Sequence, residues 1–175
     1  MAAQHLVLIG LMGAGKTTVG ERCAELLHRP ILDTDQLVEA NTRMGVADIF
    51  RHHGEQQFRV LERDAVADAC ASPEPLVIAC GGGAVLDAEN RRRLRACGLV
   101  VWLRASPAVL GTRVETGVDR PLLAGATPPL ATLERLSAQR EPAYEAAAEV
   151  QVDTEDRSVD EVAAAVVEEY ASWNG

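Results

Sequence analysis

The sequence predicts a three-layer αβα domain with a central, parallel, five-stranded sheet. Short apolar segments alternate along the chain with longer segments in which apolar residues recur every three or four positions. This alternation is typical of a parallel sheet that helices cover on both faces. In addition, three of the expected strands end in glycine-rich or acidic sequence. Ligands of such sheets bind at the carboxyl ends of the strands, so the sequence also predicts where the functional site lies.

The first two expected strands flank a helix near the amino terminus. His5–Ile9 is a compact run of β-branched and aliphatic residues, and apolar residues then recur at helical spacing between positions 19 and 27. Pro30 ends that helix because its ring cannot continue the hydrogen-bond ladder. Ile31 and Leu32 follow as a short buried strand, which the polar triplet DTD ends.

The next segment is expected to be helical throughout. Apolar spacing predicts helices between Gln36 and Ala71, with interruptions near Gly45 and Gly54 and no strand. The third strand is the apolar run Leu76–Ala79, which leads into the sequence CGGGA.

The fourth strand, Leu99–Leu103, lies between two expected helices. The basic segment Asn90–Arg95 belongs to the helix before it. Ser106 and Pro107 suit the N-cap and first turn of the helix after it, which continues to about Val114.

The last part of the chain contains one further strand. Residues 115–129 are rich in glycine and proline and lack periodicity, so a flexible lid is expected there. A helix follows over 130–144, Val150–Val152 forms the fifth strand, and the apolar spacing over 159–170 predicts a terminal amphipathic helix.

Length, charge and cysteine usage narrow the class of protein. A chain of 175 residues is expected to form a single domain, residues 1–175. The formal net charge of -9 argues against nucleic acid or an anionic membrane as partner, because both attract positive charge. No apolar run approaches the roughly 20 residues that cross a bilayer. The 4 cysteines show no C-x-x-C or zinc spacing, so we expect reduced, buried thiols in the cytoplasm.

The glycine-rich stretch at residues 10–18 carries the strongest functional signal. Gly10, Gly15, Lys16 and Thr17 satisfy the pattern G-x-x-x-x-G-K-[ST] between an expected strand and an expected helix. Glycines let backbone N–H groups approach phosphate oxygens, and the helix amino terminus attracts the same anion. Lys16 is the only lysine among the 17 Lys and Arg residues, and a flexible point charge suits the β and γ phosphates. The pattern predicts a P-loop, the alternative being a glycine-rich turn that binds nothing.

Among P-loop proteins, a small-molecule kinase fits this chain best. A Ras-type GTPase reads guanine through a loop that needs another lysine, and the sequence has none. The chain is also short, and it shows no transporter or helicase signature.

Candidates for the acceptor site follow the second and third strands. Asp33 and Asp35 would point to the same side if the extended conformation continued through Thr34, one serving magnesium and the other an acceptor hydroxyl. Alternatively, the pair caps the following helix. Gly81–Gly83 could let a ligand approach the backbone, or could form only a tight turn. Taken singly, arginines are more typical of a solvated surface. Three of them are further candidates: Arg59, Arg120 and Arg140.

In order and spacing, the chain's motifs resemble those of the shikimate kinase family. The matching segments are GLMGAGKTT, LDTD, ADIF, GEQQFR with LE, CGGGAV, RPLL and QREPAY. The similarity covers nearly the whole chain. It implies a P-loop fold of the nucleoside-monophosphate-kinase type, with a substrate-binding helical region at about 35–71. The implied reaction transfers the γ-phosphoryl group of ATP to the 3-hydroxyl of shikimate, on the route to chorismate and aromatic amino acids.

The resemblance also implies roles at the acceptor side. Asp35 matches the residue that binds the shikimate hydroxyls and assists deprotonation. Arg59 and Arg140 match the pair that grips the shikimate carboxylate, and a bidentate guanidinium suits such a planar anion. The backbone wall of the acceptor pocket is implied to consist of Gly81, Gly82 and Gly83.

On the nucleotide side, the resemblance implies a larger set. Arg120 matches a lid arginine near the transferring phosphoryl group, which makes it catalytic together with Lys16 and Asp35. Thr17 and Asp33 match the magnesium side. The residues implied to bind ATP are Gly13, Ala14, Gly15, Lys16, Thr17, Thr18, Arg113, Arg120 and Arg157, with Arg113 and Arg157 at the adenine.

The implied cofactor is one Mg²⁺ per subunit, with ATP as co-substrate and shikimate as the other ligand. A monomer in the cytoplasm is expected. Phe50 and Phe58 fall where the family lines its shikimate-binding region, and they suit a hydrophobic core equally well. Two rival hypotheses are a kinase for another hydroxylated acid such as gluconate, and a nucleotide-binding regulatory module without catalysis.

Overall fold

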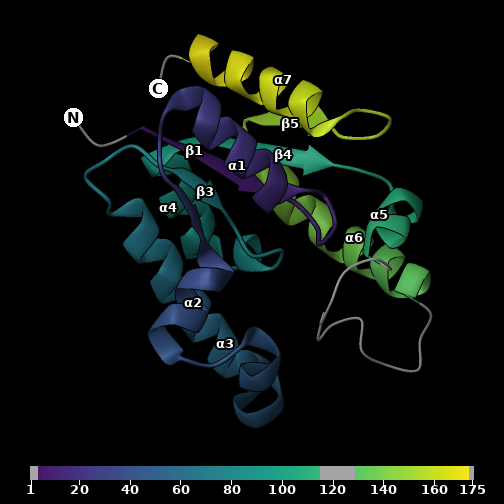
Figure 1. The fold of residues 1–175 in the computed structure, drawn as a ribbon. Coiled ribbons are helices and arrows are strands. Elements are labelled where there is room, and N and C mark those ends of the chain that lie inside the picture. Colours follow the sequence, from purple (N-terminus) through teal and green to yellow (C-terminus); the bar gives the residue numbers. More distant parts are fainter. Residues whose placement is uncertain (1–3, 115–128, 174–175) are drawn as a thin grey trace.

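Five parallel strands form the central sheet, in the order β2-β3-β1-β4-β5 (Figure 1). The computed structural model describes residues 4–114 and 129–173. The strands are β1 His5–Ile9, β2 Ile31–Asp33, β3 Val77–Ala79, β4 Gly98–Arg104 and β5 Val150–Asp153. All five residues of β1 are buried, as expected for a central strand covered on both faces. The sheet confirms the predicted fold class. Each expected strand is present, β1 with the expected bounds and the others with ends that differ by at most one residue.

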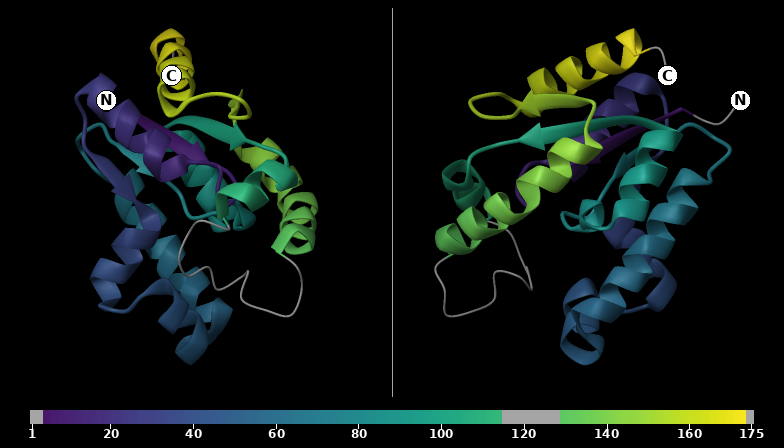
Figure 2. Two further views of the ribbon diagram at one scale, coloured as in Figure 1. Left: turned by 45° about the vertical axis from the view of Figure 1, so that its right-hand side comes forward. Right: turned by 180° about the vertical axis from the view of Figure 1, so that it is seen from behind.

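Helices cover both faces of this sheet (Figures 1 and 2). Helices α1 and α7 pack against each other on one face, and α4 and α6 cover the other, with α3 packed beside α4. The helical segments are α1 Lys16–Leu27, α2 Thr34–Thr42, α3 Val46–Cys70, the 3₁₀ turn η1 Ala84–Leu86, α4 Ala88–Cys97, α5 Pro107–Val114, α6 Pro129–Ala147 and α7 Val159–Ser172. The structure is therefore the three-layer arrangement that the alternating sequence predicts.

A second, smaller hydrophobic cluster holds α2 against α3. Its buried members are Val38, Ile49, Phe58 and Ala65. These helices project away from the sheet in Figure 1 and correspond to the expected helical region at 35–71. The predicted interruptions are present: Gly45 is the N-cap of α3, and Gly54, with φ 78°, breaks the helical geometry inside it. A left-handed φ is readily adopted only by glycine, so the kink is encoded at that position.

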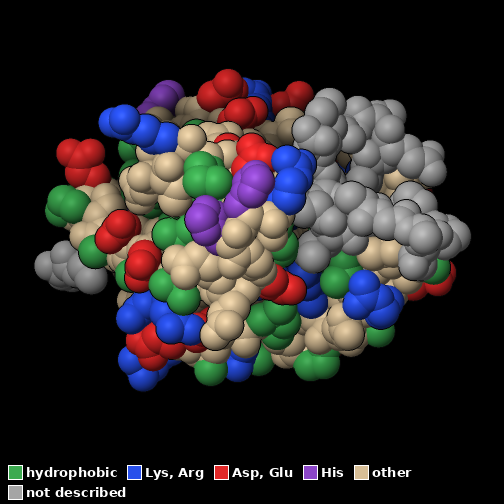
Figure 3. Space-filling model, turned by 90° about the horizontal axis from the view of Figure 1, so that it is seen from below, with side chains coloured by type: hydrophobic (Ala, Val, Ile, Leu, Met, Phe, Trp, Pro, Cys, Tyr) green, Lys and Arg blue, Asp and Glu red, His purple; other side chains and the backbone are tan. Residues whose placement is uncertain are grey.

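The predicted lid at residues 115–129 lies outside the described residues except for its last residue, and Arg120 therefore lies outside them too. Pro129 is the first residue of α6. Within the described ranges, no helix is both long enough and apolar enough to span a membrane. Viewed from below, the described surface shows acidic and basic side chains interspersed with apolar ones (Figure 3).

Candidate active site

The glycine-rich loop between β1 and α1 bends as a phosphate-binding loop requires. Gly10, Gly13 and Gly15 have φ values of 147°, 81° and 90°, which side chains with a Cβ rarely adopt. A Cβ on Gly10 would also lie 2.5 Å from the Leu103 carbonyl oxygen of β4. Gly15 caps α1 without a side chain, so the first N–H groups of this helix face the loop. The Lys16 ammonium donates to the carbonyls of Gly10 at 2.9 Å and Leu11 at 3.0 Å.

A cavity of about 560 Å³ opens where β1, β2 and β3 end. Most of the predicted site residues line it: Gly13, Gly15, Lys16, Thr17, Thr18, Asp33, Asp35, Arg59, Gly82, Gly83, Arg113 and Arg140. Both predicted phenylalanines, Phe50 and Phe58, line it as well, with ring centroids 4.7 Å apart. Ala14, Gly81 and Arg157 are described but do not belong to its lining. The fold thus brings P-loop and acceptor candidates into one space.

Asp33 lies between the P-loop and α2. Its Oδ2 accepts a 2.8 Å hydrogen bond from the Thr17 hydroxyl, and its Oδ1 accepts from the backbone N–H groups of Asp35 and Gln36. Asp33 is therefore the N-cap of α2, which begins at Thr34. The extended conformation does not continue through the DTD triplet, so the condition for Asp33 and Asp35 to project together from a strand is not met, although both line the cavity. The helix-capping alternative holds for Asp33.

Asp35 and Glu62 press against the glycine triplet that follows β3. A Cβ on Gly81 would lie 2.5 Å from Asp35 Oδ1 and 2.7 Å from Glu62 Oε1, so only glycine fits there. The Gly81 N–H donates to the buried Thr34 hydroxyl at 2.9 Å, which fixes the triplet against the start of α2. We call this closely packed triplet, Gly81–Gly83, the glycine wall; the approach of a ligand to its backbone stays a prediction.

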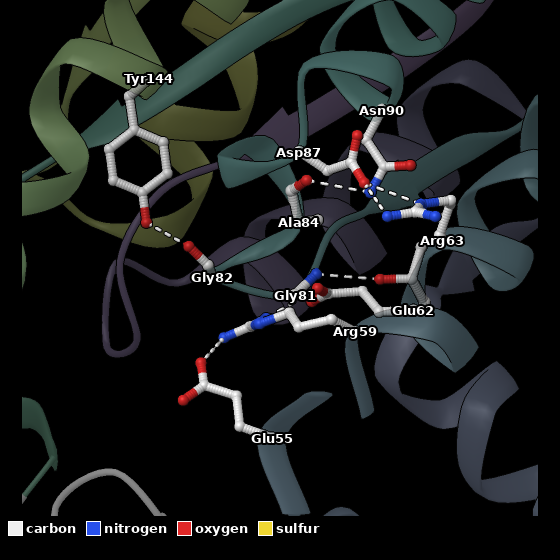
Figure 4. Close-up of polar contacts among 11 residues, drawn as sticks. Glu55, Arg59, Glu62, Arg63, Gly81, Gly82, Ala84, Asp87, Asn90 and Tyr144 are labelled. Carbon is white, nitrogen blue, oxygen red and sulfur yellow. Dashed lines mark hydrogen bonds and ion pairs between the residues drawn. The ribbon is translucent and has the colours of Figure 1, made fainter. Parts of the chain in front are cut away.

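Arg59 projects from α3 into the cavity between two carboxylates (Figure 4). Its Nη1 is 2.7 Å from Glu62 Oε2, and its Nη2 is 3.0 Å from Glu55 Oε1. Burial raises the pKa of the Glu62 carboxyl, and the Arg59 charge opposes that rise. A Cβ on Gly83 would overlap the Arg59 guanidinium. The guanidinium is therefore held in a defined orientation beside the glycine wall.

Arg140 reaches the same wall from α6. It is only 3% exposed, and a Cβ on Gly82 would lie 3.2 Å from its Nη1. Among the residues that the structure describes, no carboxylate forms an ion pair with Arg140, although Glu62 contributes to its electrostatic surroundings. A buried guanidinium that lines a cavity is strongly stabilised by an anion placed in that cavity.

Tyr144 fixes the glycine wall from α6, four residues after Arg140. Its hydroxyl donates a 2.6 Å hydrogen bond to the Gly82 carbonyl (Figure 4). Its ring stacks on Trp102 of β4. Burial raises the pKa of the phenol to about 12, so the hydroxyl keeps its proton and donates.

The two arginines expected at adenine differ in placement. Arg113 of α5 lines the cavity and donates to the Thr154 hydroxyl at 2.9 Å and the Thr154 carbonyl at 2.8 Å. Arg157 instead donates to the carbonyls of Asp153 and Glu161, within the connection from β5 to α7. The structure brings Arg113 to the candidate site and leaves Arg157 outside the cavity.

Two residues with evident roles at the site carry no role in the sequence analysis. Glu62 belongs to the LE that follows GEQQFR, and Tyr144 ends QREPAY. Spacing offered a signal for each: Glu62 lies three residues after Arg59 on a helix, and Tyr144 lies four after Arg140, so each pair shares a helix face.

The fold and the cavity together define a P-loop phosphate-binding protein with a second, guanidinium-lined subsite. The shikimate kinase family model matches residues 12–171. The chain therefore belongs to the shikimate kinase family.

Individual relatives are similar over nearly their full lengths. A shikimate kinase from Symbiobacterium thermophilum is 49% identical over 166 residues, which cover 94% of each chain. One from Caldanaerobacter subterraneus subsp. tengcongensis is 42% identical over 98% of this chain and 99% of the relative. The solved shikimate kinase from Acinetobacter baumannii in complex with shikimate superposes with a TM-score of 0.90 at 32% identity, covering 97% of this chain and 94% of that one.

A gluconokinase from Sinorhizobium meliloti 1021 is more distant, with a TM-score of 0.62 and 21% identity. That likeness shows the fold alone.

Proposed function

We propose that this chain transfers the γ-phosphoryl group of ATP to the 3-hydroxyl of shikimate, in the pathway to chorismate and aromatic amino acids. One observation carries the proposal: a single cavity holds both the P-loop and the two guanidinium groups of Arg59 and Arg140. A phosphate donor and a small anionic acceptor could therefore bind side by side. Phosphoryl transfer needs such in-line positioning and charge cancellation more than it needs covalent chemistry from the protein.

Arg59 and Arg140 bind the shikimate carboxylate in this proposal. They reach the cavity from α3 and α6, beside Gly83 and Gly82, respectively. Glu62 and Glu55 orient the first guanidinium, while the burial of the second makes an anionic partner favourable. Gly81, Gly82 and Gly83 let the ring of the acid approach the backbone.

The phosphate half of the site consists of the P-loop and the amino terminus of α1. Backbone N–H groups around Gly13, Ala14 and Gly15 bind phosphate oxygens, and Thr18 adds to the same turn. Lys16 turns from the loop carbonyls to the β and γ phosphates. Arg113 contributes on the adenine side, and Arg157 is retained there only on the family resemblance.

The oxygen ligands available beside the P-loop fit Mg²⁺. Thr17 and Asp33 offer a hydroxyl and a carboxylate 2.8 Å apart, and magnesium prefers such oxygen ligands together with phosphate oxygens. Within the described ranges, no group of three or more His, Cys, Asp or Glu side chains could hold a metal by itself. Mg²⁺, one per subunit, would lower the charge on the phosphates when bound with ATP.

Asp35 is the candidate for the residue that meets the acceptor hydroxyl. It lines the cavity, and its Oδ1 lies beside Gly81 of the glycine wall. We assign it the hydrogen bond to the 3-hydroxyl and the removal of the hydroxyl proton as the new oxygen–phosphorus bond forms. Two roles are assigned from the resemblance alone. The lid at 115–129 closes over the site, and Arg120 places a positive charge near the transferring phosphoryl group. A cytoplasmic monomer without nucleic-acid or membrane partners completes the proposal.

An ADP-release assay across three acceptors tests this function. We expect ADP release with shikimate, and background release with gluconate or a nucleoside monophosphate. Asp35→Asn should still bind ATP by calorimetry and should lose at least ~100-fold in turnover with shikimate, the lower range for a lost general base. Equal rates with gluconate, or full turnover by the Asn variant, would contradict the acceptor or the role of Asp35, respectively.

A further inference from the structure

Two of the four cysteines meet at the ends of neighbouring helices. Cys70 is the last residue of α3 and Cys97 is the last residue of α4, and these helices pack side by side. Their sulfur atoms are 3.0 Å apart, although the residues are 27 positions apart in the chain. Both are free thiols. We propose that Cys70 and Cys97 form an oxidisable dithiol, a modification site at which peroxide closes an intramolecular disulfide.

The geometry needs little change to form the bond. A disulfide requires the sulfur atoms to approach to about 2.05 Å, which is about 1 Å closer than they lie here. The sulfur atoms therefore already lie close to bonding distance across the contact between α3 and α4. Cys97 is buried where α4 ends and β4 begins, so its own thiol has a defined position beside Cys70.

The two thiols differ in a way that assigns their order of reaction. Cys70 is half-buried, so a small oxidant can reach it. A hydrogen bond from the Cys97 thiol lowers the pKa of Cys70, and the nearby Arg93 charge adds to that effect. The pKa of Cys97 is raised, because it donates that hydrogen bond and is buried. Cys70 is therefore the attacking thiolate, and Cys97 is the thiol that resolves the intermediate.

The chemistry balances with hydrogen peroxide as the oxidant. The Cys70 thiolate attacks one peroxide oxygen, the O–O bond breaks, and the released hydroxide takes up a proton to form water. Cys70 is then a sulfenic acid. The Cys97 sulfur attacks the Cys70 sulfur, the S–O bond breaks, and a second water leaves. Two thiols lose two electrons and two protons, and one peroxide is reduced to two waters.

The other two cysteines lack the solvent access and the lowered thiol pKa that Cys70 has. Cys23 is fully buried, and burial raises the pKa of its thiol to about 12. Cys80 is also buried, and its thiol pKa lies well above the ordinary value. Buried thiols of this kind are inert toward oxidants. Oxidation of the native protein should therefore be selective for the Cys70–Cys97 pair.

The test oxidises the native full-length protein with hydrogen peroxide and counts thiols. We expect the intact mass to fall by two hydrogens, N-ethylmaleimide to label two thiols rather than four after unfolding, and dithiothreitol to reverse both changes. Digestion without reductant should give one cross-linked pair of peptides, containing Cys70 and Cys97. The closed loop should raise the melting temperature by about 5 to 10 °C.

Variants assign the order of reaction. Cys97→Ser should stop at a Cys70 sulfenic acid that dimedone traps, whereas Cys23→Ala should still form the disulfide. Four labelled thiols after peroxide treatment, a cross-link to any other cysteine, or the absence of dimedone from Cys70 in Cys97→Ser would overturn the proposal. The measurements on the unmodified sequence decide the existence of the site even if a variant folds poorly.

Discussion

Replacing Tyr144 with phenylalanine removes one oxygen atom from behind the glycine wall. The hydroxyl donates a 2.6 Å hydrogen bond to the Gly82 carbonyl, and the ring is 1% exposed and stacks on Trp102. Phenylalanine keeps the ring and its stacking, so no cavity forms. The change therefore isolates the hydrogen bond that ties α6, which also carries Arg140, to the acceptor pocket.

The magnitude follows from removing a hydrogen bond to a carbonyl that is only partly buried. Such a loss costs about 0.5–1.5 kcal/mol, and for a chain of this size each kcal/mol lowers the melting temperature by about 2–4 °C. Gly82 lines the cavity, so its carbonyl and the adjacent Arg140 should both become less well positioned for the acid. A positioning loss of about 1 kcal/mol corresponds to a roughly fivefold rise in KM for shikimate. We expect KM for ATP to change less than about twofold, because the Tyr144 hydroxyl bonds to Gly82 and not to a residue of the P-loop.

Coupled kinetics with each substrate varied, together with thermal unfolding, would measure both effects. Tyr170→Phe is the matched control, since its hydroxyl also donates a 2.6 Å hydrogen bond to a carbonyl, that of Gln4. The control should lower the melting temperature while leaving both KM values unchanged. If Tyr144→Phe lowers stability but leaves KM for shikimate unchanged, the link between this hydroxyl and the acceptor pocket is refuted.

Two further predictions concern charge at the site. Lys16→Ala should lower kcat/KM at least ~100-fold, because losing one preorganised donor to the transition state costs at least ~2.7 kcal/mol. Unchanged turnover would show that Lys16 is not catalytic. The pKa of Glu62 in the folded protein lies above its ordinary value of 4.5, so its contribution to stability is fully present below pH 4.5 and is lost as the pH rises through the folded pKa. Denaturant unfolding between pH 4 and pH 8 should therefore show a fall in the free energy of unfolding of the wild type, and Glu62→Gln should lack this fall. Parallel plots of unfolding free energy against pH for the two proteins would contradict the raised pKa.

Much of the fold could be predicted because its signals are local. The continuous apolar strands, the helical spacing between positions 19 and 27, and the interruption at Gly54 all depend on neighbouring residues alone. The P-loop is similarly local, because its glycines, lysine and helix amino terminus lie within nine consecutive residues, 10–18. The residues that form each of these features are neighbours in the sequence, so the local pattern alone is enough to predict the local structure.

What could not be predicted depends on contacts between distant elements. The DTD triplet permitted two conformations, and the helix that begins at Thr34 decided between them by placing Asp33 at its N-cap. The bond from Tyr144 to Gly82 joins residues 62 positions apart, and nothing in local spacing indicates it. Glu62 was visible at helical spacing from Arg59, yet its burial against Gly81 follows only from the packing of α3 on the end of β3.

Calorimetric titration of two variants tests the central claim that one cavity contains two separable subsites. Arg140→Ala should weaken shikimate binding at least ~10-fold, as expected for losing a charged hydrogen bond, while the Kd for ATP stays within about twofold. Lys16→Ala should give the reverse pattern. A loss of affinity for both ligands in either variant, with its fold intact by circular dichroism, would contradict the account.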